Sequence, residues 1–194
     1  QAEDGMVVRT ESPALNQSRR VTAELLIANH KAECLSCPMD THCELQRIAA
    51  YVGIEQPRLD RMRRPAFDAP VDDSNPFFTL DPNKCVLCGI CVRTCEELRL
   101  VSAIDLGFRG FHTVISTFGN RPRVESNCES CGACVARCPV GALYPSDFRL
   151  PAREVQTTCT YCGVGCGLYL GVRGNQVVGA RADPDRATNK GALC

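Results

Sequence analysis

The 194-residue sequence has neither an excess of one charge nor a long apolar run. Lysine and arginine together number 22, and aspartate and glutamate also number 22, so the formal net charge is zero. Such a composition lacks the basic excess with which many proteins bind nucleic acid or anionic membrane surfaces. No stretch offers the roughly 20 apolar residues of a membrane-spanning helix, and no apolar signal segment stands at the start. We expect a cytoplasmic protein, with no nucleic acid and no membrane span, whose partners are proteins or redox cofactors.

Cysteine, by contrast, is abundant, with 15 residues in the chain. An odd number of cysteines argues against a framework of disulfides, and free thiols suit a reducing compartment. Four groups account for all of them, and one group combines three cysteines with a histidine. The groups are His30, Cys34, Cys37 and Cys43; Cys85, Cys88, Cys91 and Cys95; Cys128, Cys131, Cys134 and Cys138; and Cys159, Cys162, Cys166 and Cys194. Each group can supply the four ligands of a 4Fe-4S cluster, so the chain is predicted to hold four clusters and to conduct electrons.

Zinc is the main alternative to an iron–sulfur cluster. A tetrahedral zinc site is usually built from two well-separated ligand pairs, whereas the run C-x2-C-x2-C-x3-C places four cysteines close together. This run occurs at residues 85–95 and again at 128–138. The outer groups are less decisive, because Cys159, Cys162 and Cys166 could be half of a zinc site. Either His30 or His42 could complete the first group, and a lone histidine is more often a surface or core residue than a ligand.

Apolar periodicity and turn residues predict an α+β fold made of small metal-stapled modules. Two helices should flank the first ligand group, the second ending at Gly53, where a left-handed cap is expected. Near the end of the chain, residues 168–172 and 176–181 should form a hairpin around Gly174 and Asn175. The expected apolar faces are Val21, Leu25, Leu26 and Ala28 in the first helix, and Leu45, Ile48, Ala49 and Val52 in the second.

The chain divides into four segments. Residues 1–54 are the histidine-containing helical module, and residues 55–84 are predicted to be a linker because five prolines interrupt residues 57–82. Residues 85–150 hold the duplicated run, whose copies begin 43 positions apart and suggest a pseudo-twofold module. Residues 151–194 hold the last group. A start at Gln1 without methionine and an end on the ligand Cys194 indicate an internal piece of a longer polypeptide.

Residues 85–139 closely resemble bacterial two-cluster ferredoxins. In that family the fourth cysteine of each run ligates the other cluster. The second run ends in Cys138-Pro139 as the ferredoxin pattern does, whereas the first ends in Cys95-Glu96, a departure that leaves the ligands intact. The resemblance implies one cluster on Cys85, Cys88, Cys91 and Cys138 and another on Cys95, Cys128, Cys131 and Cys134.

Both outer groups also resemble known modules. The pattern H-x3-C-x2-C-x5-C, in ELLIANHKAECLSCPMDTHCELQ, is similar to the histidine-ligated cluster module of the complex I and hydrogenase families, which implies His30 as the ligand. The pattern C-x2-C-x3-C, followed by 27 residues and Cys194, stands in TCTYCGVGCGLYLGVRGNQVVGARADPDRATNKGALC. It resembles the opening domain of the molybdopterin oxidoreductases, whose 4Fe-4S cluster is the one nearest the pterin.

Taken in order, the modules resemble the catalytic alpha subunit of NAD-dependent, molybdenum- or tungsten-containing formate dehydrogenases over all 194 residues. The resemblance implies that a 2Fe-2S cluster and a molybdenum or tungsten centre with bis-pterin guanine dinucleotide lie outside the chain. The catalytic residues would lie there too, so none is assigned. The same resemblance implies two partners, a flavin- and NAD-binding diaphorase subunit and a small iron–sulfur subunit.

Three rival functions remain open. Iron-only hydrogenases share the first two modules, but their catalytic domain opens differently from residues 159–194. The large cluster-bearing subunit of NADH-quinone oxidoreductase has the histidine-type module and a related tail, but it generally lacks the duplicated run. A stand-alone polyferredoxin would shuttle electrons without a substrate site, which fits a sequence that contains no recognisable base, nucleophile or substrate pocket.

Overall fold

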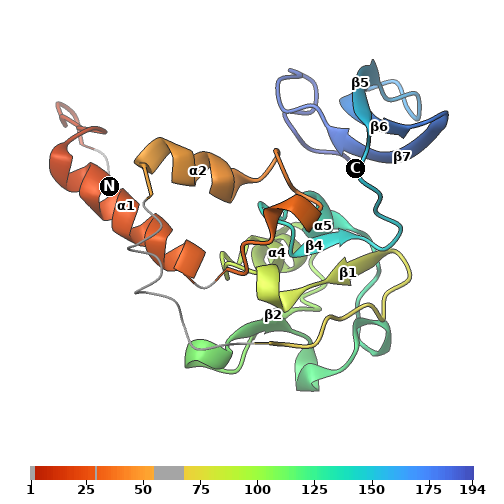
Figure 1. Cartoon of the computed structure of the whole chain (residues 1–194), viewed down its shortest axis with the longest axis horizontal. Coiled ribbons are helices and arrows are strands. Elements are labelled where there is room, and N and C mark those ends of the chain that lie inside the picture. Colours follow the sequence, from red (N-terminus) through yellow and green to blue (C-terminus); the bar gives the residue numbers. More distant parts are fainter. Residues whose placement is uncertain (1–2, 29, 55–67) are drawn as a thin grey trace.

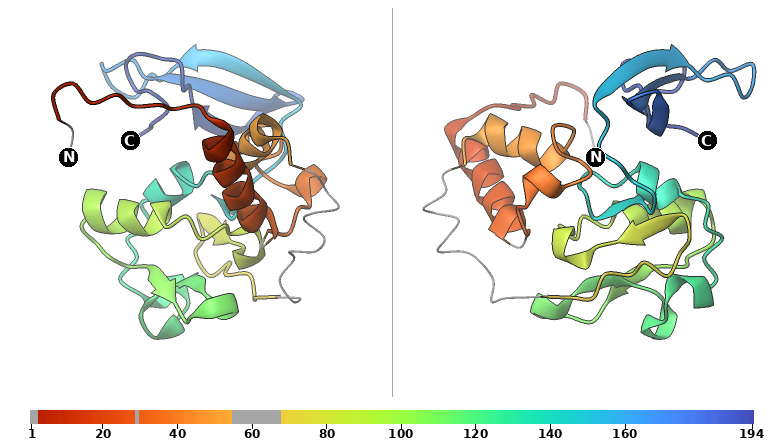
Figure 2. Two further views of the ribbon diagram at one scale, coloured as in Figure 1. Left: turned by 90° about the vertical axis from the view of Figure 1, so that its left-hand side faces the viewer. Right: turned by 45° about the vertical axis from the view of Figure 1, so that its right-hand side comes forward.

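The structure is a computed structural model, and it describes residues 3–28, 30–54 and 68–194. A helical N-terminal part and a C-terminal three-stranded sheet lie on the same side of a central module of short strands and helices (Figure 1). The two views in Figure 2 show the same arrangement, with both outer parts above the central module. Among the described residues, no helix is both long enough and apolar enough to cross a membrane.

The N-terminal part consists of helices α1 (Pro13–Ala28) and α2 (Glu44–Val52), with a 3-10 turn, η1 (Cys34–Ser36), between them. Proline at the first position of α1 and Ser12, whose Oγ accepts the Leu15 N–H at 3.2 Å, define its start. Helix α2 ends as predicted, because Gly53 adopts φ 65° and its N–H donates to the Ala49 carbonyl.

The predicted helix faces are only partly correct. In α1 the buried residues are Ala23, Glu24 and Ala28, whereas Leu25 is 52% exposed. In α2 Leu45 is buried, but Ile48 is 43% exposed. The alanines let α1 approach its neighbours closely, so the buried stripe follows small residues that a search for large apolar ones does not weigh.

The central module contains two two-stranded antiparallel sheets. Strand β1 (Phe78–Leu80) pairs with β4 (Leu143–Pro145), and β2 (Asp105–Gly107) pairs with β3 (Val114–Ser116). Its helical elements are η2 (Pro82–Lys84), α4 (Ile90–Arg93), the π-helical turn η3 (Thr94–Leu98), η4 (Gly110–His112), η5 (Phe118–Asn120), η6 (Arg123–Glu125) and α5 (Ala133–Ala136).

The segment predicted to be a linker is therefore partly ordered structure. Residues 55–67 lie outside the described residues, but β1 and η2 occupy 78–84, and Asp72 bridges to Leu80 in antiparallel fashion. A three-residue strand between prolines is too short to produce a recognisable alternation of side chains. Its pairing with β4, some 60 residues away, is a tertiary effect.

The 43-residue repeat in the sequence is also a repeat of the backbone. Gly89 and Gly132 have φ of 69° and 71°, and each directly precedes a four-residue helix, α4 or α5. Two positions earlier, Leu87 and Ser130 also have positive φ, 55° and 54°. Both cysteine runs therefore wrap around their sites through the same pair of left-handed residues.

Two apolar clusters hold the N-terminal and central parts together. The first lies inside the central module, where Phe78, Leu80, Ile104, Ile115 and Leu143 are buried with Cys91. The second joins the parts, because Cys43 and Leu45 pack with Val86, Val140 and Ala142. Backbone hydrogen bonds reinforce this contact, from Glu44 N–H to the Pro139 carbonyl at 3.1 Å and from Lys31 N–H to the Asn83 carbonyl at 3.1 Å.

The C-terminal part is an antiparallel sheet in the order β5 (Arg153–Thr158), β6 (Gly167–Arg173) and β7 (Gln176–Ala182). The predicted hairpin is β6–β7, turning at Gly174, whose φ is 60°. Strand β5, with the sequence REVQTT, was not predicted, because it has a single large apolar residue. Among the described residues, His42 Nε2 of the N-terminal part lies 3.5 Å from Glu154 Oε1 of the sheet, a contact that is an ion pair when His42 is protonated.

Candidate iron–sulfur sites

All 15 cysteines lie within the described ranges, and each is a free thiol. Within those same ranges, no three histidine, cysteine, aspartate or glutamate side chains lie close enough to bind one metal ion. A 4Fe-4S core is larger than a single ion and takes its ligands at four separate corners. The four predicted groups differ in how far the chain brings their members together.

The first group lines one open cavity of about 380 Å³, into which His30, Cys34, Cys37 and Cys43 all face. Cys34 begins the turn η1, and the Cys37 N–H closes it by donating to the Cys34 carbonyl at 2.9 Å. Cys43 stands directly before α2, where the free N–H groups of a helix start favour a thiolate. Burial raises the pKa of Cys43, while the N–H groups of Gln46 and Leu45 oppose that rise.

His30 has its second ring nitrogen occupied. Its Nδ1 lies 3.0 Å from the Lys84 carbonyl, so this nitrogen carries the proton and donates it, which leaves Nε2 with its lone pair. Histidines that bind metals commonly donate their other N–H to a backbone carbonyl in this way. Burial lowers the pKa of His30 and so favours the neutral ring that a ligand requires. His42 instead faces Glu154.

The second site combines the first three cysteines of one run with the last cysteine of the other. Cys85, Cys88, Cys91 and Cys138 are close enough for their charges to influence one another's pKa. Burial raises the pKa of Cys85 to about 11 and that of Cys91 to about 12, with the neighbouring thiols adding to both. Cluster binding must displace these protons, because a cluster is bound by thiolates. It therefore stabilises the deprotonated cysteines, which without a cluster remain protonated at neutral pH.

The third site has the reverse composition, three cysteines from the second run and one from the first. Cys95, from the first run, lines one cavity together with Cys128, Cys131 and Cys134 of the second run. The Ala103 N–H donates to Cys95 Sγ at 3.3 Å, an N–H···S bond of the kind that stabilises a ligating thiolate. Burial raises the pKa of Cys134 to about 11. Cys95 therefore lies beside the thiols of the second run, and Cys138 lies close enough to Cys85 and Cys91 to affect their pKa.

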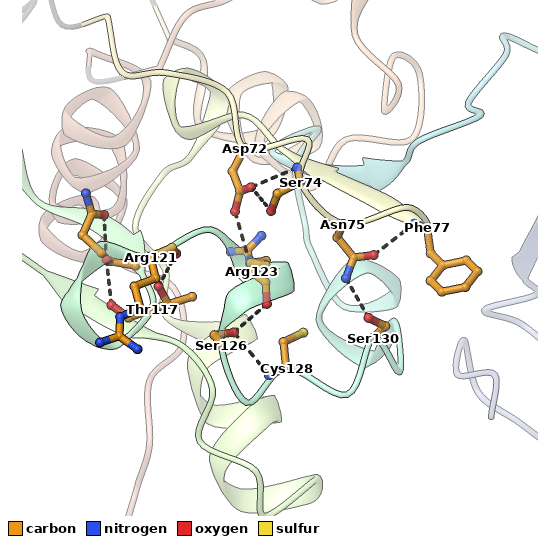
Figure 3. A network of polar contacts seen from close by, with 12 residues as sticks. Asp72, Ser74, Asn75, Phe77, Thr117, Arg121, Arg123, Ser126, Cys128 and Ser130 are labelled. Carbon is orange, nitrogen blue, oxygen red and sulfur yellow. Dashed lines mark hydrogen bonds and ion pairs between the residues drawn. The ribbon is translucent and has the colours of Figure 1, made fainter.

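A polar network surrounds this third cavity (Figure 3). Arg123, only 2% exposed, forms part of the cavity wall. Its carbonyl accepts Ser126 Oγ–H at 2.8 Å, and Ser126 Oγ accepts the Cys128 N–H at 3.2 Å. On the other side, Asn75 Nδ2 donates to Ser130 Oγ at 2.7 Å. These contacts fix the loop that presents Cys128 and Cys131.

The fourth group is only partly assembled. The Cys159 N–H donates to the Cys166 carbonyl at 2.8 Å, which closes the loop between β5 and β6. The Tyr161 N–H lies 3.5 Å from Cys159 Sγ, the same relation that Leu87 N–H has to Cys85 Sγ at 3.4 Å. Cys162 and Cys194 are exposed.

Asn189 connects the two ends of this fourth group. It accepts the Gly167 N–H at 2.8 Å and donates to the Gly167 and Ala192 carbonyls at 3.0 and 2.9 Å. Its side chain therefore ties the residue after Cys166 to a residue two positions before Cys194. The segment after β7, residues 183–194, therefore folds back toward the loop between β5 and β6.

Sequence reasoning missed two residues next to these sites. Gly141 faces Cys37, since a Cβ built on it would lie closer than 3.0 Å to Cys37 Sγ. Arg123 looks like an ordinary surface arginine in the sequence. The repeat offered a weak signal, because counting back 43 positions from Arg123 reaches Leu80, an apolar residue of the kind that is usually buried.

Three protein-family profiles match consecutive parts of the chain. The NADH-ubiquinone oxidoreductase-G iron-sulfur binding region matches residues 19–58. The 4Fe-4S dicluster domain matches residues 84–142, and the molybdopterin oxidoreductase Fe4S4 domain matches residues 152–194. The first and last matches each contain one of the predicted cysteine groups, and the dicluster match contains the other two.

Curated relatives match nearly the whole chain. An NADH-quinone oxidoreductase subunit of Rhizobium meliloti is 35% identical over 100% of this chain and 23% of its own length. NADPH-Fe(3+) oxidoreductase subunit alpha of Geobacter sulfurreducens is 33% identical over 99% of this chain and 22% of its own length. "Putative formate dehydrogenase SH0748" of Staphylococcus haemolyticus is 24% identical over 97% of this chain and 23% of its own length. The chain thus spans less than a quarter of the length of these relatives.

The Rhizobium match alters one expectation. The expectation was that NADH-quinone oxidoreductase subunits generally lack the duplicated run. The Rhizobium match covers the whole chain, including residues 85–144, so this region does not distinguish the chain from such subunits. Among solved structures, an NAD+-reducing [NiFe]-hydrogenase in the H2-reduced state has a TM-score of 0.63 and 30% identity, over 75% of this chain and 61% of that chain. The chain therefore matches, in order, an NADH-G-type iron–sulfur region, a 4Fe-4S dicluster domain and a molybdopterin oxidoreductase Fe4S4 domain, all of them iron–sulfur modules.

Proposed function

We propose that the chain holds four 4Fe-4S clusters on its fifteen cysteines and His30 and relays electrons within a larger redox enzyme. The observation that carries the proposal is the crossed arrangement of the central thiols. Cys95 lines the cavity of the second run, and Cys138 joins the thiols of the first. A chain that needed only structural zinc would have no reason to exchange the fourth cysteine between two sites.

We retain the proposed domain order with one adjustment. Residues 1–54 hold the His30 site, residues 85–150 hold the paired sites, and residues 151–194 hold the last site. Within the proposed linker of 55–84, residues 78–80 pair with β4, residues 82–84 form the turn η2, and both elements belong to the central module. The proposed linker therefore ends before β1 and is shorter than the predicted range of 55–84.

When bound, each cluster takes up and returns one electron, and the remaining work falls to the protein. The chain buries Cys37, Cys43 and Cys91, leaves Cys88, Cys131, Cys162 and Cys194 exposed, and brings the His30 site close to the Cys85 site. One link runs from the His30 ring through a hydrogen bond to the Lys84 carbonyl, whose carbon is bonded to the Cys85 nitrogen. The buried contact of Cys43 and Leu45 with Val86 and Val140 keeps solvent away from this junction.

For the parent reaction, we propose oxidation of formate to carbon dioxide, two electrons and a proton, at a molybdenum or tungsten centre outside the chain. The molybdopterin-type match at residues 152–194 supports an origin of electrons near Cys159, Cys162, Cys166 and Cys194. A flavin- and NAD-binding subunit and a small iron–sulfur subunit are the proposed recipients, on the side of the His30 site. The resemblance to an NAD+-reducing hydrogenase supports such a recipient.

The full-length gene product with its partner subunits tests this reaction. We expect formate-dependent reduction of NAD under anaerobic conditions. A Cys37→Ala variant should retain formate oxidation with an artificial dye but lose NAD reduction, because the dye accepts electrons before they reach the His30 site. Absence of formate oxidation in a fully metallated wild type would remove formate from the proposal.

A second candidate is a subunit that exchanges electrons with NADH or NADPH and does not act on formate. The identities of 35% and 33% to the NADH-quinone and NADPH-Fe(3+) subunits favour it over the 24% identity to the formate dehydrogenase relative. The same preparation distinguishes the two. Reduction of a quinone or of ferric iron by NADH or NADPH, without formate oxidation, would assign this second function.

A further inference from the structure

Arg123 is a buried charge at the edge of the third site. It is 2% exposed, and it lines the cavity that contains Cys95, Cys128, Cys131 and Cys134. Its backbone is anchored to the same site, because Ser126 links the Arg123 carbonyl to the Cys128 N–H. Figure 3 shows the guanidinium between Asp72 and the loop that carries Cys128. The backbone of Arg123 is therefore coupled to a proposed ligand, and its side chain lies buried beside the same site.

The guanidinium is incompletely satisfied by the protein. Its Nε lies 3.9 Å from Asp72 Oδ2, and its Cζ lies 5.9 Å from the centre of the Phe78 ring. Among the described residues, no acceptor lies within hydrogen-bond distance of Nη1, although this atom is buried. An unpaired buried donor on a charged group is costly, so a cluster sulfur is the natural acceptor in this cavity.

Asp72 offsets only part of this charge. Its Oδ1 already accepts the Ser74 N–H at 3.2 Å and the Ser74 hydroxyl at 2.6 Å, which draws electron density away from Arg123. Two other charged residues line the cavity, Arg99 and Glu129, but they face each other at 4.0 Å and are 46% and 61% exposed. Solvent screens that pair, so Arg123 dominates the field in the cavity.

The second site differs from the third at the position equivalent to Arg123. The residue 43 positions earlier is Leu80, an apolar core residue. The nearest cation in the sequence, Lys84, is paired with Asp81 at 3.2 Å, and both side chains are nearly buried. By the 43-residue spacing, the position of Arg123 in η6 thus corresponds to an apolar residue of β1, and the two proposed sites differ in charge at this position.

We propose that Arg123 donates a hydrogen bond to the cluster on Cys95, Cys128, Cys131 and Cys134 and raises its reduction potential above that of the cluster on Cys85, Cys88, Cys91 and Cys138. The inference rests on the proposed function, since it requires that both clusters are bound. Reduction adds one negative charge to a cluster, and a buried cation with an N–H directed at the sulfurs favours that state. Arg123 is in this sense a positioning and tuning residue, which gives the two paired sites different electron affinities.

The test is an EPR-monitored redox titration of the full chain, prepared anaerobically, with iron and acid-labile sulfide measured on every sample. The variants are Arg123→Met, Arg123→Lys and Asp72→Asn, with Arg99→Gln as the matched control for an exposed arginine on the same cavity. The signal that disappears in Cys131→Ser identifies the third site. In Arg123→Met we expect the equilibrium constant for reduction of this site to fall at least tenfold, a shift of 59 mV for one electron.

The other variants should move in defined directions. Asp72→Asn should raise the potential of the same site, because it removes the counter-charge nearest to the guanidinium and leaves Arg123 in place. Arg123→Lys should recover part of the lost potential, whereas Arg99→Gln should change the constant less than threefold. If Arg123→Met does not incorporate the cluster, the rise in Asp72→Asn decides the matter.

The two possible failures are distinguishable. A wild-type chain without iron and sulfide would overturn the proposed function and this inference together. A fully loaded wild type whose third-site potential stays unchanged in both Arg123→Met and Asp72→Asn would overturn this inference alone.

Discussion

Replacing Gly141 with alanine should separate the N-terminal part from the central module at the His30 site. Gly141 is buried, and a Cβ built on it would lie closer than 3.0 Å to Cys37 Sγ, with Pro38 Cδ at 3.4 Å and Met39 N at 3.7 Å behind it. Ordinary contact begins near 3.4 Å, so the two segments must move apart to make room for the new methyl group. A ligating cysteine cannot rotate away to provide this space, because its sulfur is fixed by the cluster.

Overpacking of this kind costs about 1–3 kcal/mol. For a chain of 194 residues this corresponds to roughly 2–10 °C in the unfolding midpoint. The assay is an anaerobic thermal scan together with the rate of iron release to a ferrous chelator, which should rise in Gly141→Ala for one cluster out of four.

Gly179→Ala is the matched control, because a Cβ at Gly179 meets no atom within 4 Å and its φ is not left-handed. We expect its midpoint to stay within about 2 °C of the wild type, since an exposed substitution without a clash changes stability by at most about 0.5 kcal/mol. If Gly141→Ala has the same midpoint and the same iron release as Gly179→Ala, the close approach of Gly141 to Cys37 is not a feature of the folded protein.

Three further predictions follow from the sites and from the sheet. Cys95→Ser should remove the EPR signal of the Cys128 site and Cys138→Ser that of the Cys85 site, and the reverse assignment would contradict the crossed arrangement. His30→Cys should lower the potential of its cluster, because a thiolate adds a negative charge where the imidazole has none; an unmoved potential in redox-monitored EPR would argue against His30 as a ligand. Arg181 donates two hydrogen bonds to Glu154, at 2.8 and 2.5 Å, and these lower the pKa of Glu154 below its ordinary 4.5. The stability that this pair adds is therefore complete above pH 4.5, the pKa of the unfolded state. It is lost as the pH falls through the lower pKa of the folded state. The gap between the unfolding midpoints of wild type and Glu154→Gln should therefore close as the pH falls below 4.5, and a gap that widens below pH 4.5 would contradict the ion pair with Arg181.

The ligand groups could be predicted because their signal is local. A C-x2-C-x2-C run supplies three donors from a single turn, and Gly89 and Gly132 stand where the turn needs positive φ. The same locality made Gly53 and the β6–β7 hairpin predictable. Each of these features depends on residues only a few positions apart.

The features that escaped prediction depend on residues that are distant in sequence. Arg123 becomes a buried charge only because Asp72 and Phe78, some 50 residues earlier, close over it. Gly141 matters only after Cys37 docks against it. Strand β5 is held by pairing with β6, although its own side chains alternate weakly. The exposed positions of Leu25 and Ile48 likewise reflect packing against neighbours that periodicity does not reveal.

The central claim is that this chain is a carrier of four cubane clusters. Iron and acid-labile sulfide analysis of the anaerobically purified chain, with EPR of the reduced sample, tests it most directly. The account predicts about sixteen iron and sixteen sulfide per chain and signals from four interacting clusters. Zinc in place of iron at any of the four groups, or cysteines joined as disulfides, would contradict it.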